Sequence, residues 1–183
     1  MPGIDEVCVR GPVRLRRWRA ADRDALTRVV RDCLPQLRPW LPWASGEYTG
    51  EDAAEFLRGA EEGWQRGSSF CFAITTGGAV VGGIGLEQRH GMRVCEIGYW
   101  LHPDHRGLGL VSCGVVLLVE QAWRGPVQRV QIRHDANNAA SAAVPRRLGF
   151  TCVEGDAACE PGAGLSGVEW VWQLDRPGSG LQQ

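Results

Sequence analysis

The sequence predicts a mixed α/β domain in which a central sheet is flanked by helices. Strand-like and helical periodicities alternate along the chain. The stretch 95–150 contains, in order, an apolar strand, a glycine-rich turn, a helix, a second strand and a second helix. The 183 residues are 44% hydrophobic and include eight tryptophans, enough to fill one core. We therefore expect a single domain over residues 1–175 and a disordered tail over residues 176–183.

The first quarter of the chain indicates one strand and one helix. Val13 and Leu15 alternate with arginines, as in a short strand, and apolar residues from Ala21 to Cys33 follow helical spacing. Three prolines are then expected to break the chain into short turns: Pro35, Pro39 and Pro42.

A second helix is expected after these turns. Thr49, followed three residues later by Asp52, resembles a capping box with Asp in place of the usual Glu. The apolar residues that follow make one stripe through Arg66, as on a helix that packs against a sheet.

Four further strands are expected as two pairs. Residues 70–76 and 79–88 are joined by Gly77-Gly78, a hairpin signal. Residues 151–156 and 168–174 flank a glycine-rich loop near the end of the chain.

The middle of the chain has the most informative functional pattern. Bulky residues alternate over 95–101, and His102 begins a break in the strand. Two near-adjacent glycines, Gly107 and Gly109, then lead into an apolar run that is long enough for a buried helix but too short for a membrane span. Glycines at a helix start let backbone N–H groups approach a ligand, and the helix N-terminus adds partial positive charge. The pattern predicts a site for a phosphate-bearing cofactor.

Two common phosphate-binding motifs do not fit this segment. The dinucleotide fingerprint needs a third glycine where Ser112 stands. The phosphate loop of nucleotide triphosphatases needs a lysine, and the chain contains none. ATP and GTP chemistry is therefore not expected.

Composition limits the partners. All 20 basic residues are arginines, against 21 acidic residues, so the net charge near zero gives no reason to expect nucleic acid or a membrane as partner. The chain start lacks a basic segment followed by an apolar one, so we expect a cytoplasmic protein. Seven cysteines occur singly, without a partner at ligand spacing, so no metal site is expected.

The glycine segment, Arg106-Gly107-Leu108-Gly109-Leu110-Val111, resembles the pyrophosphate loop of the GNAT superfamily of acyl-CoA N-acyltransferases. That loop has the pattern Arg/Gln-x-x-Gly-x-Gly/Ala, and Val111 replaces its final small residue. Asn138-x-x-Ser141, followed by Leu148-Gly149-Phe150, is similar to the next segment of the same family. Residues 37–44 are similar to its RimJ/RimL-like branch, which includes enzymes that acetylate the N-terminal α-amines of ribosomal proteins.

The resemblance covers about residues 13–174 and implies a mainly antiparallel sheet, splayed where acyl-CoA enters. It implies transfer of an acetyl group from acetyl-CoA to a primary amine by direct attack. The amine would belong to a protein N-terminus or a small molecule, and a homodimer is left open. Cofactor contacts are implied for Trp100, Leu101, His102, the six residues of the glycine segment and Asn138.

The resemblance also implies a base and an acid. A glutamate on the central strand often serves the family as base, through water, and Glu96 occupies that strand. We expect it among apolar neighbours, which would raise the pKa of its carboxyl, although a structural ion pair with an arginine is the alternative. Many members use a tyrosine as acid, and Pro145 occupies its register here. The resemblance to RimL-like enzymes implies instead the serine of Asn-x-x-Ser as acid, which corresponds to Ser141. Helix capping is the alternative role for Asn138 and Ser141.

Pro145 has a consequence of its own. Its nitrogen carries no hydrogen, so it cannot bond the carbonyl of Ser141 four residues earlier, and we expect the helix to kink or loosen there.

The sequence says less about which residues bind the acceptor amine. Trp40 and Trp43 lie in the segment that borders the acceptor cleft in the resembling branch, and ordinary packing explains them equally well. Two alternatives to acetyl transfer stay open. One is the same fold with another donor, such as succinyl-CoA, and the other is a non-catalytic acyl-CoA-binding regulatory module.

Overall fold

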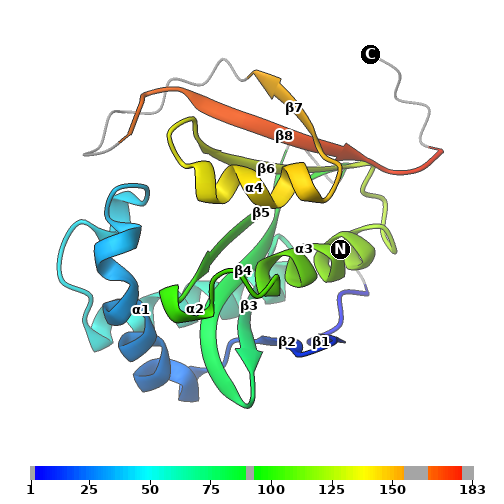
Figure 1. The fold of residues 1–183 in the computed structure, drawn as a ribbon. Coiled ribbons are helices and arrows are strands. Elements are labelled where there is room, and N and C mark those ends of the chain that lie inside the picture. The colour runs from blue at the N-terminus through cyan, green and yellow to red at the C-terminus, as the bar shows by residue number, and fades with distance from the viewer. Residues whose placement is uncertain (1–2, 90–92, 155–164, 179–183) are drawn as a thin grey trace.

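The computed structural model describes residues 3–89, 93–154 and 165–178, and their strands form one eight-stranded sheet (Figure 1). In chain order the strands are β1 (Val7–Arg10), β2 (Val13–Arg17), β3 (Ser69–Thr76), β4 (Ala79–Arg89), β5 (Val94–Leu101), β6 (Arg129–Asp135), β7 (Thr151–Glu154) and β8 (Glu169–Asp175). The helices are α1 (Arg23–Leu37), α2 (Gly50–Arg66), α3 (Leu110–Ala122) and α4 (Ala139–Arg147). Short 3-10 turns are η1 (Ala20–Asp22), η2 (Pro42–Ala44) and η4 (Pro103–His105).

The strand order is β1-β2-β3-β4-β5-β6-β8-β7, and every neighbouring pair is antiparallel except β5 with β6. The prediction of a mixed, mainly antiparallel sheet flanked by helices is therefore confirmed. Strand β1 was not predicted, because its exposed valines alternate with a cysteine and an arginine over only four residues.

Strands β5 and β6 separate soon after they begin to pair. Only Val94–Glu96 of β5 pairs with Arg129–Gln131 of β6. Beyond this point β5 continues to pair with β4, and β6 continues to pair with β8, to the end of each strand. We call this separation the fork, and it comprises residues 97–101 of β5 and 132–135 of β6. The fork is the splay that was predicted.

Helices cover both faces of the sheet. Helices α3 and α4 pack in one large apolar cluster with side chains of seven of the strands, including Ile97 and Ile132. Helices α1 and α2 pack in a second cluster, on the other face, with Ala73 and Trp100. Alternation along β5 therefore turns Tyr99 and Leu101 toward α3 and α4, and Trp100 toward α1. Figure 1 shows α4 lying over β6, beside the fork.

Local signals mostly predicted the helices correctly. The capping box of α2 is present, since the Thr49 side chain accepts from the Asp52 N–H and the Asp52 carboxylate accepts from the Thr49 N–H at 2.6 Å. The predicted break at Pro35 is wrong, because α1 continues through it to Leu37. Pro35 lies on the exposed side of the last turn, where its missing N–H removes a single bond and the buried Leu34 and Leu37 still hold the helix.

Arg176, the first residue of the predicted tail, is held by hydrogen bonds. Arg176 donates its N–H to the Gln128 carbonyl at 2.8 Å and its guanidinium to the Gly125 carbonyl at 3.0 Å. Residues 155–164 lie outside the described residues, and they include the end of the predicted strand 151–156 and residues 160–164 of the predicted glycine-rich loop, 160–167. Residues 179–183 of the predicted tail lie outside them as well.

Close packing near the start of β4, opposite the end of β5, yields a first prediction. A Cβ added to Gly82 would lie 2.4 Å from the Trp100 carbonyl oxygen, a backbone atom that cannot move without opening the β4–β5 ladder. We expect Gly82→Ala to lower the free energy of unfolding by about 1–3 kcal/mol, measured by urea denaturation.

Gly85→Ala is the matched control on the same strand. Its added Cβ would lie 3.6 Å from the Cys71 sulfur, an ordinary contact. We expect a change of at most about 1 kcal/mol in either direction. Equal stability of the two variants would contradict the close approach of β4 and β5 at Gly82.

Candidate functional site

A glycine loop links the end of β5 to the start of α3. Gly107 and Gly109 adopt left-handed conformations with φ of 76° and 72°, which favour glycine, and Gly109 is the N-cap of α3. The first N–H groups of this 13-residue helix have no partner within the helix and are directed out of its N-terminus. The predicted loop is thus present at the end of β5, beside the fork.

Positive charge gathers at the same helix end. Arg106 lies in the loop and is exposed. Arg147, from the last turn of α4, donates to the Ser112 hydroxyl in the first turn of α3 at 3.2 Å. Sequence reasoning missed Arg147, since nothing in its spacing shows that the end of α4 meets the start of α3. Together with the helix dipole, these groups favour a bound anion.

His102 and His105 shape the turn before the loop. The Nδ1 atom of His102 accepts from the Asp104 N–H at 3.3 Å, and the two imidazole rings lie 5.8 Å apart. His102 also donates its backbone N–H to the Val81 carbonyl at 2.8 Å.

That backbone bond fixes which amide points into the fork. In an antiparallel pair, successive residues direct their N–H groups alternately toward and away from the partner strand. His102 bonds to Val81 of β4, so Trp100, opposite Gly83, also faces β4. The N–H of Leu101 therefore points the other way, toward β6, five residues beyond the last β5–β6 pair. Of the implied cofactor contacts Trp100, Leu101 and His102, only Leu101 directs its N–H into the fork.

Tyr99, Ser141 and Asn138 meet on the α4 side of the fork. The Tyr99 hydroxyl donates to the Ser141 carbonyl at 3.0 Å and lies 3.2 Å from the Ser141 hydroxyl. Asn138 caps α4, its side-chain oxygen accepting from the Ser141 N–H at 3.1 Å. Capping, the alternative role considered for Asn138, is therefore present. The Tyr99 bond to the Ser141 carbonyl and the Asn138 cap each contribute about 0.5–1.5 kcal/mol net to stability.

Pro145 explains why the Ser141 carbonyl is open to a side chain. Helix α4 is continuous through Pro145, but the proline nitrogen has no hydrogen to donate four residues back. The Tyr99 hydroxyl bonds that carbonyl instead. Nothing in the sequence indicated this hydroxyl contact.

Glu96 lies on the opposite face of β5, and its surroundings differ from the prediction. Its carboxylate oxygen Oε2 lies 3.1 Å from Nε of Arg89 and 3.4 Å from Nε of Arg133. Arg133 in turn bonds Glu169 at 2.8 Å. The prediction that Glu96 has apolar neighbours is therefore wrong, because β4 and β6 bring Arg89 and Arg133 to this face. The structural ion pair, the alternative considered for Glu96, is present.

The predicted acceptor residues lie on the same side of the sheet as Glu96. Trp43, in η2, is 48% exposed and packs edge-on against Tyr48 at 6.0 Å. Trp40 is half-buried just before this turn. Leu41 and Ala44, from the same segment, share the α1–α2 cluster with Trp100 of β5. The segment therefore covers the face of β5 opposite Ser141.

The end of β6 holds buried polar groups that the sequence did not indicate. The Trp172 indole donates to Nε2 of His134 at 2.8 Å, so this nitrogen is the unprotonated one, and Nδ1 lies 2.7 Å from the Asp135 carbonyl. Burial by itself raises the pKa of Asp135, but the N–H groups of Asn137 and Ser166 and the Ser166 hydroxyl hold it below its ordinary value. These bonds fix the entry to α4.

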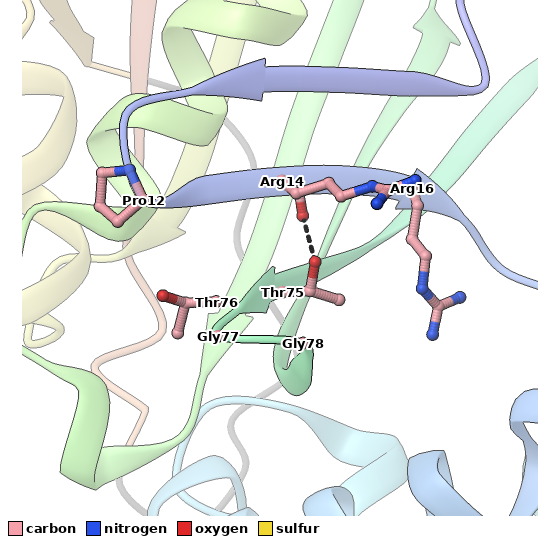
Figure 2. Close-up of a pocket in the computed structure, with 7 residues that line it drawn as sticks. All are labelled: Pro12, Arg14, Arg16, Thr75, Thr76, Gly77 and Gly78. Atoms are coloured by element: carbon pink, nitrogen blue, oxygen red, sulfur yellow. Dashed lines mark hydrogen bonds between the residues drawn. The ribbon is translucent and has the colours of Figure 1, made fainter.

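A surface hollow elsewhere contains none of the predicted residues. It has a volume of about 240 Å³ and lies where the β1–β2 turn meets the β3–β4 hairpin. Figure 2 shows the Thr75 hydroxyl donating to the Arg14 carbonyl, at 2.8 Å, with the Arg16 guanidinium extending beside it. Arg16 is held by Asp22 through two bonds of 2.7 Å. Neither guanidinium of this hollow belongs to the glycine loop or the fork.

Comparison with known proteins gives consistent matches. Residues 13–151 match the family described as acetyltransferase (GNAT) domain. The ribosomal-protein-serine acetyltransferase of Escherichia coli (strain K12) is 29% identical over 116 residues, which cover 62% of this chain and 65% of that protein. This match spans slightly less than two thirds of the relative's length.

Solved structures share the fold. RimL, described as a ribosomal L7/L12 alpha-N-protein acetyltransferase in complex with coenzyme A, has a TM-score of 0.85 at 24% identity, covering 93% of this chain and 98% of that one. The microcin C7 self-immunity acetyltransferase MccE, in complex with acetyl-CoA and AMP, also has a TM-score of 0.85, at 18% identity, covering 91% and 94%.

The described residues show neither a membrane-spanning helix nor a metal-ligand cluster. None of the described helices combines the length and apolar character that a membrane span requires. No cluster of three or more potential metal ligands occurs in the described ranges.

The tyrosines yield a second prediction. The chain has two, Tyr48 and Tyr99, and burial raises the pKa of each to about 12, although the bond to Ser141 lowers that of Tyr99 somewhat. In the unfolded chain the tyrosine side chains titrate at about pH 10. The ultraviolet absorbance of tyrosinate should therefore stay absent from the folded protein at pH 10 and appear on unfolding.

Stability should fall over the same range. Between pH 10 and 12 the unfolded chain has lost phenolic protons that the folded chain still holds, so the free energy of unfolding decreases as pH rises. If tyrosinate absorbance of the folded protein rose with a midpoint of about pH 10, the raised pKa values of the two tyrosines would be contradicted.

Proposed function

The chain belongs to the acetyltransferase (GNAT) domain family, and on that premise we propose that it transfers an acetyl group from acetyl-CoA to a primary amine, with a protein N-terminal α-amine as acceptor. One observation carries the proposal: the glycine loop and the N-terminus of α3 lie at the same end of β5 as the fork. A diphosphate site thus adjoins an unpaired strand edge. The complexes of RimL with coenzyme A and of MccE with acetyl-CoA support the choice of donor.

The loop residues would hold the diphosphate and the fork would hold the acyl arm. The amides that begin α3, with Arg106 and Arg147 beside them, suit two phosphate charges. Asn138 would keep its side-chain amide for the pantetheine arm while its oxygen caps α4. The Leu101 N–H, directed toward β6, would donate to the thioester carbonyl oxygen.

Bound acetyl-CoA supplies an activated thioester carbonyl. Glu96 and Ser141 would act on it from opposite faces of β5, since Glu96 shares the face of Trp100, and Ser141 bonds Tyr99 on the other. Glu96 lies three residues before Tyr99, roughly 10 Å along the strand, so it would take the proton from the amine through water. The Leu101 N–H stabilises the charge that develops on the oxygen, and Ser141 donates a proton to the leaving thiolate.

The proposal also covers the acceptor amine, the cellular compartment and the partners. The E. coli relative is named for a ribosomal-protein serine, which supports a protein N-terminus over a small-molecule amine. Trp40 and Trp43 would border the acceptor on the Glu96 side. We place the enzyme in the cytoplasm, without nucleic acid or membrane as partner, and its state as monomer or homodimer is open to measurement.

A third prediction tests the donor site by calorimetric titration with acetyl-CoA. Gly109→Ala forces a residue with a Cβ into the left-handed conformation at the start of α3, so the first amides of the helix must turn away. We expect acetyl-CoA binding to weaken at least about tenfold, equivalent to about 1.4 kcal/mol.

Gly11→Ala is the matched control. Gly11 is also left-handed, with φ of 56°, and like Gly109 has open space around it, but it lies in the turn between β1 and β2. Acetyl-CoA binding should stay within about twofold of wild type, because only backbone strain is shared. Equal weakening in both variants, or binding of succinyl-CoA in preference to acetyl-CoA, would contradict the proposed donor site.

A fourth prediction tests the two catalytic assignments. Glu96→Gln and Ser141→Ala should each lower kcat at least about tenfold in an acetyl-transfer assay with an N-terminal peptide, because each removes a proton-transfer group. Acetyl-CoA affinity should be unchanged, since neither side chain is assigned to the diphosphate or pantetheine.

Glu87→Gln is the control for Glu96, because Glu87 lies opposite it on β4 and bonds the same arginine, Arg89, at 3.3 Å. It should retain wild-type kcat. A similar loss in both glutamine variants would make Glu96 part of a structural ion-pair network. Acetyl-CoA binding without any transfer would support the regulatory-module alternative.

A further inference from the structure

Two residues far apart in the sequence, Tyr99 and Pro145, determine how the Ser141 carbonyl is bonded on the α4 side of the fork. Pro145, inside α4, lacks the N–H that would bond the Ser141 carbonyl. The Tyr99 hydroxyl donates to that carbonyl at 3.0 Å. Tyr99 belongs to the part of β5 that has left β6, so its hydroxyl bridges the strand to the helix across the fork.

The same hydroxyl also reaches the Ser141 side chain, at 3.2 Å. A phenol has one hydrogen to donate, and here the carbonyl takes it. Before acetyl-CoA binds, the Tyr99 oxygen can accept from the Ser141 hydroxyl, which fixes the position of the Ser141 oxygen. The Ser141 hydrogen can still rotate about the C–O bond and turn to the leaving thiolate. The phenol holds its own hydrogen at neutral pH, since its ordinary pKa is about 10 and burial raises the pKa of Tyr99 to about 12.

We propose that Tyr99 is a positioning residue for Ser141, replacing the helical amide that Pro145 removes. This inference rests on the proposed role of Ser141 as acid. A helix in which residue 145 had an N–H would hold the Ser141 backbone by itself. In this chain the first turn of α4 is held instead from β5, so the acid is set relative to the strand that supplies the Leu101 amide.

The proposal predicts that two distant positions are coupled. In Tyr99→Phe the Ser141 carbonyl loses its donor, and α4 has no amide to replace it. In Pro145→Ala the alanine N–H becomes available to that carbonyl, so the phenol is needed less. The loss of kcat caused by Tyr99→Phe should therefore be smaller when Pro145→Ala is also present.

The test is a set of double-mutant cycles read by kcat at saturating acetyl-CoA. Tyr99→Phe should lower kcat at least about tenfold, because a small displacement of a catalytic group is costly. In the Pro145→Ala background the same change should cost less than about threefold. In the Ser141→Ala background it should cost nothing further, since Tyr99 acts through Ser141. Acetyl-CoA affinity should be unchanged throughout.

Two controls match the substitutions chemically. Tyr48→Phe removes the same hydroxyl from the other tyrosine, which lies in the α1–α2 cluster. Pro35→Ala restores an amide to the other proline found inside a described helix, α1. Neither should change kcat or its response to Tyr99→Phe. Wild-type kcat in Tyr99→Phe, or an equal loss in all three backgrounds, would overturn the proposal.

Amide hydrogen exchange in α4 separates this inference from the proposed function. Tyr99→Phe should speed exchange in the first turn of α4, and Pro145→Ala should reverse it. If Ser141→Ala has wild-type kcat, or the protein transfers no acetyl group, the proposed acid fails, and with it the positioning role. The exchange data would then show whether Tyr99 still anchors α4. Unchanged exchange in Tyr99→Phe would overturn the anchor itself.

Discussion

The separation of β5 from β6 is the constraint on which the candidate site depends. The two strands pair over three residues and then each follows its outer neighbour, β5 with β4 and β6 with β8. This leaves one edge of β5 without strand partners over residues 97–101, in the middle of the sheet. An edge amide at Leu101, the glycine loop at the end of β5 and the start of α4 all meet there. Without the fork they would be parts of a closed sheet.

The fork also divides the chemistry between two faces. The face under α4 holds Tyr99 and Ser141, joined by hydroxyl contacts, whereas the face under α1 holds Trp100 and Glu96. An acyl group within the fork would then be open to an amine from one side and release its thiolate toward the other. This arrangement suits direct transfer, because the amine can add to one face of the planar carbonyl while the thiolate leaves the tetrahedral intermediate by a separate path.

Much of this fold could be predicted from the sequence, because its signals are local. The Gly77-Gly78 hairpin, the Thr49 capping box and the glycine loop each depend on residues within a few positions of one another. The errors concern contacts between distant segments. The arginines around Glu96 come from β4 and β6, and Arg147 reaches α3 from the end of α4.

Tyr99 shows what could have been predicted and what could not. The missing amide of Pro145 is visible in the sequence and predicts an open carbonyl at Ser141. Which donor fills it depends on the packing of α4 against β5, which no spacing gives. Propensity and pattern therefore locate the unusual position, and tertiary structure identifies its partner.

A crystal structure of the protein with acetyl-CoA would show whether the fork holds the acyl group. We expect the diphosphate at the N-terminus of α3 and the thioester within the fork. The carbonyl oxygen should lie about 3 Å from the Leu101 nitrogen, with the sulfur on the side of Ser141. Acetyl-CoA bound outside the fork, or a thioester whose sulfur lies on the Glu96 side of β5, would contradict this arrangement.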